Sequence, residues 1–162
     1  GVRRALLSSG QTRPSADTEV GGKDKDHAKK KVALTCGFVG SRYYGLQFNS
    51  SVPLPTIEKE IVQALHAAGY ISDRNAPSPG KVKLSRCSRT DKGVHAVRTV
   101  LSMKLMLPKS ELQQKSGVNV HLPALPALVN RHLPADIRVF GAVTTNASFA
   151  GKTVCSSDFR SV

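Results

Sequence analysis

The sequence predicts an α+β fold with one four-stranded antiparallel sheet and both of its helices on one face. Four runs alternate apolar and polar residues like strands, and two other segments carry the apolar period of a helix. Their order is strand, helix, strand, strand, helix, strand. That order is the split βαβ or ferredoxin-like arrangement, which leaves one face of the sheet without helices.

The first half of this domain holds one strand and the clearest helix. Residues 31–39 form the predicted strand. The helix begins after Thr56, a typical N-cap residue, and Gly69 is a typical stop. Its apolar stripe consists of Ile57, Ile61, Val62 and Leu65.

The second half holds three predicted strands and one helix. The middle strands cover residues 81–85 and 101–107, and their connection carries Asp91. A polar, aperiodic surface excursion is predicted from Pro108 to His121, and a short helix between Ser110 and Lys115 is the alternative. The second helix has Pro126 in its first turn and ends at Pro134, and residues 137–143 form the last strand.

The connection around Asp91 supports two interpretations. Asp91 and Gly93 have ordinary turn spacing, in which the carboxylate bonds its own backbone and the glycine takes positive φ. A turn, however, does not need the three cations around it, which are Arg86, Arg89 and Lys92. The cations favour a functional acid, and the structural turn remains the alternative.

The charge balance predicts a polyanionic partner, and RNA is the polyanion that it favours. The chain has 24 Lys and Arg against 11 Asp and Glu, a net charge of +13, and a pI near 10.1. Residues 1–31 carry eight basic and four acidic side chains, so most of the excess lies in the folded part. A generally basic, solubilising surface is the alternative explanation.

The chain divides into a tail and a domain. Residues 1–30 lack an apolar period and are predicted to be a disordered basic tail, and residues 31–162 form the domain. Arg3, Arg4 and Arg13, with serines and no acid before Asp17, are typical of a transit segment, which predicts a mitochondrial or other organellar location. A nuclear location and an uninformative tail are the alternatives.

Two classes of protein are not supported by the sequence. No apolar run is long enough to span a bilayer, so a membrane protein is not expected. Cys36, Cys87 and Cys155 lie far apart and are expected to be reduced thiols, and the five histidines show no ligand spacing. The sequence therefore predicts no metal site.

Several motifs together resemble the TruA family of pseudouridine synthases, particularly its eukaryotic, tRNA-modifying branch. The most specific is Arg89-Thr90-Asp91-Lys92-Gly93-Val94-His95-Ala96. Ser41 to Gln47, Thr56 to Glu58, and the block Asn130 to Val139 resemble further family segments in the same order. The resemblance extends from about Lys31 to about Cys155.

The resemblance implies the fold above and a chemistry. It makes Asp91 the catalytic carboxylate for the isomerisation of uridine to pseudouridine in tRNA or another structured RNA such as rRNA, with no cofactor. The expected RNA-contacting side chains are Arg89, Lys92, Arg86, Tyr43, Tyr44 and His95. Arg89 is also suited to fill the space left by an extruded base.

The C-terminal end departs from the family pattern. Between Phe149 and Val162 only Phe149 and Cys155 agree, and the position of the base-stacking tyrosine is not a tyrosine here. The chain also corresponds to the first half of the family's catalytic domain. Two interpretations stay open: part of a working synthase, or a silent RNA-binding subunit of a ribonucleoprotein such as an organellar ribosome, in which other protein subunits cover the exposed sheet edge.

Overall fold

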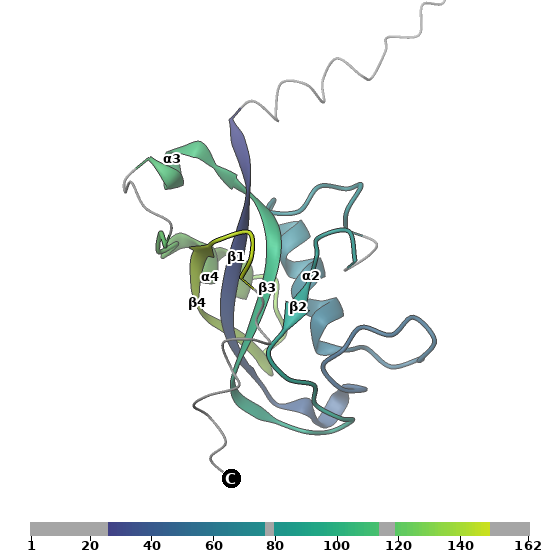
Figure 1. Ribbon diagram of the computed structural model, residues 1–162. Helices are drawn as coiled ribbons and strands as arrows, with labels where there is room; N and C mark the ends of the chain where they lie inside the picture. Colours follow the sequence, from purple (N-terminus) through teal and green to yellow (C-terminus); the bar gives the residue numbers. More distant parts are fainter. Residues whose placement is uncertain (1–25, 77–79, 114–118, 150–162) are drawn as a thin grey trace, which may run out of the picture.

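The computed structural model describes residues 26–76, 80–113 and 119–149, and its architecture is the predicted one. Four strands form one antiparallel sheet in the spatial order β2-β3-β1-β4 (Figure 1). Helices α2 and α4 lie on the same face of the sheet, behind it in the view of Figure 1. The ferredoxin-like α+β fold expected from the order of elements is confirmed.

The elements follow the chain in the order β1 (His27–Phe38), η1 (Gly40–Arg42), α2 (Ile57–Ala67), β2 (Ser85–Arg86), β3 (Ala96–Pro108), α3 (Lys109–Leu112), α4 (Ala124–Asn130) and β4 (Ile137–Thr145).

The hydrophobic core lies between the sheet and the two helices. In β3, Leu101, Met103, Leu105 and Leu107 are at most 1% exposed, because a period of two places them all on the helix-covered face. The same face of β1 buries Val32 and Leu34, and α2 buries Ile57, Ile61 and Leu65 against them. The predicted apolar faces of both element types are confirmed.

β1 is longer than the sequence pattern suggested. Residues 27–30 were assigned to the tail, but they pair with β3 from His27↔Pro108 to Lys30↔Leu105. Backbone pairing with β3 places this polar stretch in the sheet although it has no apolar period. The boundary between tail and domain therefore moves to residue 27. The earlier part of the predicted tail, with its transit-like segment, falls in residues 1–25, outside the described residues.

β2 is shorter than predicted. Only Ser85 and Arg86 pair with β3, opposite Ser102 and Leu101. Lys83 has a φ of +52°, and its N–H donates to the Gly80 carbonyl at 3.2 Å, so residues 80–83 form a turn in place of a strand. The predicted alternation still buries Val82, whose carbonyl accepts a hydrogen bond from the Lys104 N–H at 2.7 Å.

The segment after β3 follows the prediction in outline. A short helix, α3, begins at Lys109, and Pro126 lies in the first turn of α4 as expected. The apolar side expected for this helix consists of Leu125, Leu128, Val129 and His132, and it is confirmed at Leu125 and Val129. Leu128 and His132 are exposed, and α4 ends at Asn130, before the expected end at Pro134. Residues 120–122 run beside β4 and bond Ala142 and Thr144, so they cover part of that sheet edge.

The described residues contain no helix long and apolar enough to cross a membrane. They also contain no group of three or more His, Cys, Asp or Glu side chains arranged to hold a metal ion. Cys36 is a buried free thiol, as expected, and burial raises its pKa to about 12. Cys87 is disulfide-bonded, so the expectation of a reduced thiol is wrong there, and Cys155 lies outside the described residues.

Truncation of one core residue tests the position of the core. Leu101→Ala is expected to lower the free energy of unfolding by about 2–5 kcal/mol, because it leaves a cavity under the helices. Val97→Ala, in the same strand but at a side chain that is 93% exposed, is the matched control and should change it by less than about 0.5 kcal/mol. Urea denaturation measures both, and equal effects would contradict the assigned core.

Candidate active site

The loop that carries Asp91 connects β2 to β3. We call residues 87–95 the motif loop; it lies at the lower end of the sheet in Figure 1. Its backbone forms the turn that the sequence predicted: the Val94 N–H donates to the Asp91 carbonyl at 3.2 Å, and Gly93 has a φ of +78°. The turn and the functional acid are therefore compatible interpretations.

The Asp91 side chain takes no part in that turn. It is exposed, and within the described residues no hydrogen bond or ion pair engages its carboxylate. The loop is held by backbone groups on either side of Asp91 instead. This leaves both carboxylate oxygens available to a ligand.

A second segment, residues 40–46, holds the motif loop in place. The Leu46 N–H donates to the Thr90 carbonyl at 3.2 Å, and the Gly93 N–H donates to the Tyr43 carbonyl at 3.3 Å. These two contacts bracket Asp91 along the chain. The loop conformation thus depends on a segment about fifty residues earlier in the sequence.

Two glycines in this segment make the close approach possible. A Cβ at Gly40 would overlap the Val94 carbonyl, and the Gly40 N–H donates to Nδ1 of His95 at 2.9 Å. Gly45 has a φ of +90°, and a Cβ there would lie 2.8 Å from the Thr90 carbonyl oxygen. Larger residues at either position would push the two segments apart.

Helix α2 fixes the same segment from the other side. The Ile57 N–H donates to the Gly45 carbonyl at 3.2 Å and the Glu58 N–H donates to the Leu46 carbonyl at 3.0 Å. These carbonyls satisfy the first N–H groups of the helix, and the hydroxyl of Thr56 makes no capping bond. Thr56 stands at the predicted N-cap position, but the carbonyls of Gly45 and Leu46 cap the helix in place of its side chain.

A buried ion pair joins α2 to the start of the motif loop. Glu58 is fully buried, and its carboxylate accepts hydrogen bonds from Nε and Nη2 of Arg86, the latter at 3.1 Å. It also accepts the Phe48 N–H at 2.7 Å. Arg86, the last residue of β2, is therefore engaged inside the protein.

A second polar cluster anchors the segment to the start of β4. The Tyr43 hydroxyl donates to Oδ1 of Asp136 at 2.7 Å, and the Arg42 guanidinium donates twice to Oδ2, at 2.8 and 3.0 Å. Burial opposes ionisation of Asp136, but the bonds from Tyr43 and Arg42 outweigh it and lower its pKa. Burial, together with the bond to Asp136, raises the pKa of Tyr43.

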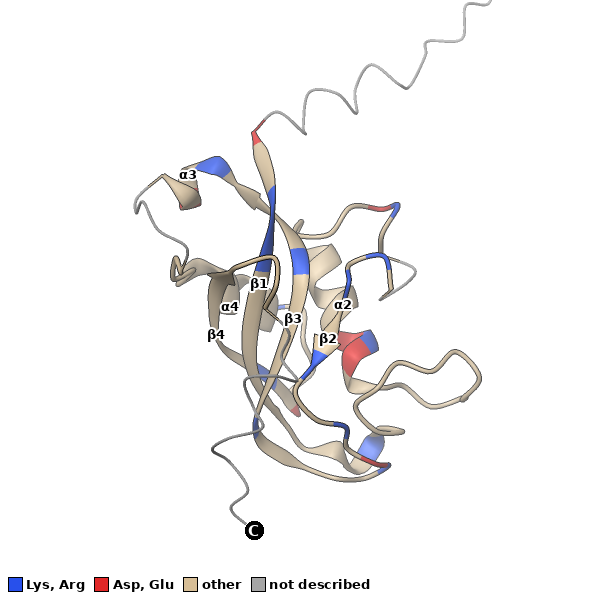
Figure 2. Cartoon of the chain, viewed as in Figure 1, with Lys and Arg blue, Asp and Glu red and all other residues tan. Residues whose placement is uncertain are grey.

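The predicted RNA-contacting residues divide into two groups. Arg89, Lys92, Tyr44 and His95 are exposed, and the Lys92 ammonium lies 5.3 Å from the centroid of the Tyr44 ring. Tyr43 is buried, and Arg86 is mostly buried. Those two side chains already bind Asp136 and Glu58. Figure 2 shows the basic residues of the motif loop close to its acidic one.

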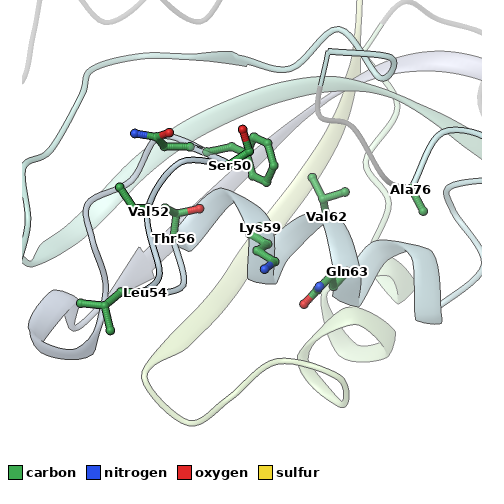
Figure 3. A pocket seen from close by; sticks show the side chains of 10 residues that line it. Ser50, Val52, Leu54, Thr56, Lys59, Val62, Gln63 and Ala76 are labelled. Carbon is green, nitrogen blue, oxygen red and sulfur yellow. The ribbon is translucent and has the colours of Figure 1, made fainter.

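Asp91 is not among the lining residues of two pockets in the described part of the chain. One, of about 320 Å³, lies between residues 48–54 and the exposed side of α2 (Figure 3). Lys59, Val62 and Gln63 line it from the helix. The other lies near Lys31 and Lys104. The acid is instead on an open surface at the end of the sheet.

Sequence reasoning missed Glu58 and Asp136 as positioning residues. The sequence marked Glu58 only as the last residue of the segment Thr56 to Glu58 that resembles the family. One signal was present: Glu58 lies on the same helical face as Ile61 and Leu65, where a charge needs a buried partner. No local pattern marks Asp136, whose partner Tyr43 is 93 residues away.

The comparisons with known proteins give one consistent result. The chain is 37% identical to the tRNA pseudouridine synthase 1 of Yarrowia lipolytica over 90% of its length, and 41% identical to that of Schizosaccharomyces pombe over 80%. It is 37% identical to the tRNA pseudouridine(27/28) synthase of Saccharomyces cerevisiae over 76%. The chain spans 21–29% of the length of these relatives. No family model matches it.

The buried ion pair can be tested by a double-mutant cycle. Arg86→Ala is expected to lower the free energy of unfolding by about 3–5 kcal/mol, because it leaves the buried Glu58 carboxylate unpaired. The variant with both Arg86→Ala and Glu58→Ala should lose less than the sum of the single losses. Denaturant unfolding measures all three, and strictly additive losses would show that the two side chains do not interact.

The Asp136 cluster predicts a pH dependence of stability. The folded state lowers the pKa of Asp136, so its stabilisation is complete above the ordinary Asp value near 4 and is lost as the pH falls through the lower folded value. Asp136→Asn should therefore lower stability at neutral pH and flatten the loss of stability in acid. Melting temperatures measured from pH 7 to pH 2 check this, and parallel curves for both proteins would contradict it.

Proposed function

This chain belongs to the TruA family of tRNA pseudouridine synthases, and from that premise we propose that it supplies the catalytic carboxylate of an enzyme that converts uridine to pseudouridine in RNA. The observation that carries the proposal is the unengaged Asp91 side chain on a loop whose backbone is bonded on both sides of it. An acid serving only as a loop brace would bond the loop itself.

The reaction suits a single carboxylate. The bond between C1′ of the ribose and N1 of uracil breaks, the base turns, and a bond forms between C1′ and C5. The proton leaves C5, N1 carries one in the product, and there is no net oxidation or hydration. A carboxylate forms a covalent adduct with the substrate and leaves again, so no cofactor is needed.

The substrate has to be brought to this acid out of its base stack. Extrusion of a uridine costs a few kcal/mol, which contacts to the flanking phosphates and base stacking offset. In this proposal, exposed Arg89 and Lys92 hold the backbone beside Asp91, and the Tyr44 ring beneath Lys92 offers a stacking surface. His95 lies at the end of the same loop.

Two residues expected to touch RNA have a different part in the proposal. Arg86 and Tyr43 position the motif loop and its bracing segment, because their polar atoms already bond Glu58 and Asp136. We assign them to positioning and assign the RNA contacts to Arg89, Lys92, Tyr44 and His95. The chain spans about a quarter of the length of the Yarrowia lipolytica relative, and the activity, substrate and partners proposed here are those of the whole protein.

Removal of the carboxylate tests the catalytic role. Asp91→Asn is expected to reduce tritium release from tRNA labelled at C5 of uracil by roughly a thousandfold or more, since it removes the nucleophile, while RNA binding persists. Asp73→Asn, at an exposed acid on the surface loop after α2, is the matched control and should retain full activity.

The result decides between the two interpretations of the chain. Activity in the Asp91→Asn protein at the level of the unaltered protein would overturn the assignment of Asp91. Binding of RNA without tritium release, measured in a protein with the full length of the relatives, would favour the silent ribonucleoprotein subunit.

A further inference from the structure

The second pocket lies at the end of the sheet far from the motif loop. It has a volume of about 470 Å³ and is formed where β1 begins and β4 ends. Its polar lining includes Lys29, Lys30, Lys31, Lys104, Thr145 and Asn146. None of these residues belongs to the candidate active site.

The register of the sheet brings three of these side chains into one row. Lys31 of β1 is directly opposite Lys104 of β3 on one side and Thr145 of β4 on the other. Lys29 follows on the same face, two residues before Lys31. This is the face that α2 and α4 leave uncovered, and Figure 2 shows the basic segment of β1 beside the basic position on β3.

The row has no acidic counterpart within the described residues. No Asp or Glu lines the pocket, and none of its four lysines forms an ion pair there. The one hydrogen bond from these ammonium groups runs from Lys31 to the Ala147 carbonyl at 3.4 Å. Like charges directly opposite each other on paired strands are destabilising. A bound anion would therefore reduce the repulsion between the ammonium groups of Lys31 and Lys104.

We propose that this pocket binds phosphate groups of the RNA backbone, at a contact point separate from Asp91. Lysine offers a compact charge and three donors to a phosphate, and the Thr145 hydroxyl and Asn146 amide add neutral donors. The lining contains no aromatic ring for stacking, so the contact positions the RNA without reading its sequence. It also lacks the exposed apolar anchors that a protein partner would require.

The separation of the two sites defines the RNA that can reach both. Lys104 lies eight positions after Ala96, which is at the edge of the motif loop, and eight steps of extended strand correspond to roughly 26 Å. Arg98 and Arg138 are exposed on the same face between them. An A-form RNA stem of only about five base pairs is too short to cover that distance, whereas an intact tRNA is long enough to reach both sites.

This inference rests on the proposed function only in taking tRNA as the bound RNA. Binding measurements therefore test the phosphate site separately from the isomerase activity. The variant carries Lys31→Gln and Lys104→Gln, and the control carries Lys59→Gln, an exposed lysine on α2 at the other side of the sheet. Affinity is measured against salt concentration for intact tRNA and for a hairpin of about five base pairs with a target uridine.

We expect the slope of log affinity against log salt for tRNA to fall in magnitude by about one to two in the double variant. The hairpin slope and the Lys59→Gln control should not change. The melting temperature of the double variant should stay the same or rise, because a like-charge pair is removed.

An unchanged tRNA slope in the double variant would overturn the inference, and so would an equal loss for the hairpin. The inference would also be overturned if the double variant lost affinity for an acidic peptide but kept its full affinity for tRNA. If the slope falls but the Asp91→Asn protein releases tritium as the unaltered protein does, the phosphate site stands and the proposed role of Asp91 fails.

Discussion

The buried carboxylate of Glu58 is the constraint on which the arrangement of the candidate site depends. A charge without solvent is costly unless hydrogen bonds surround it, and Glu58 is surrounded by the Arg86 guanidinium and the Phe48 N–H. Those donors belong to β2 and to the loop before α2. Satisfying one side chain therefore fixes the relative positions of a strand end, a helix start and the segment between them.

The two acids near the motif loop have opposite environments, and this separates their roles. Glu58 has all of its partners inside the protein and acts on the structure. Asp91 has none among the described residues, because backbone groups of Tyr43 and Leu46 carry the loop in its place. A carboxylate can remain available to a substrate only if other groups hold its loop in place, and residues 40–46 supply those groups.

Charged side chains lie at both ends of the sheet. Asp91 and its neighbouring cations lie at one end, and the row formed by Lys31 and Lys104 lies at the other. A basic patch at a distance from the reacting group can hold a long polyanion by its backbone while the acid meets a single nucleotide. Under the two proposals above, affinity and chemistry are carried by different residues.

The sequence alone determined the element types, the core faces and the Asp91 turn, since each depends on residues within a few positions of one another. The alternation of Leu101, Met103, Leu105 and Leu107 and the family motif around Asp91 were readable in that way. Only the tertiary structure decided that Tyr43 is buried against Asp136, that Arg86 pairs with Glu58, and that Lys31 faces Lys104. Those pairings follow from strand register and chain reversal over many residues, which no local pattern specifies.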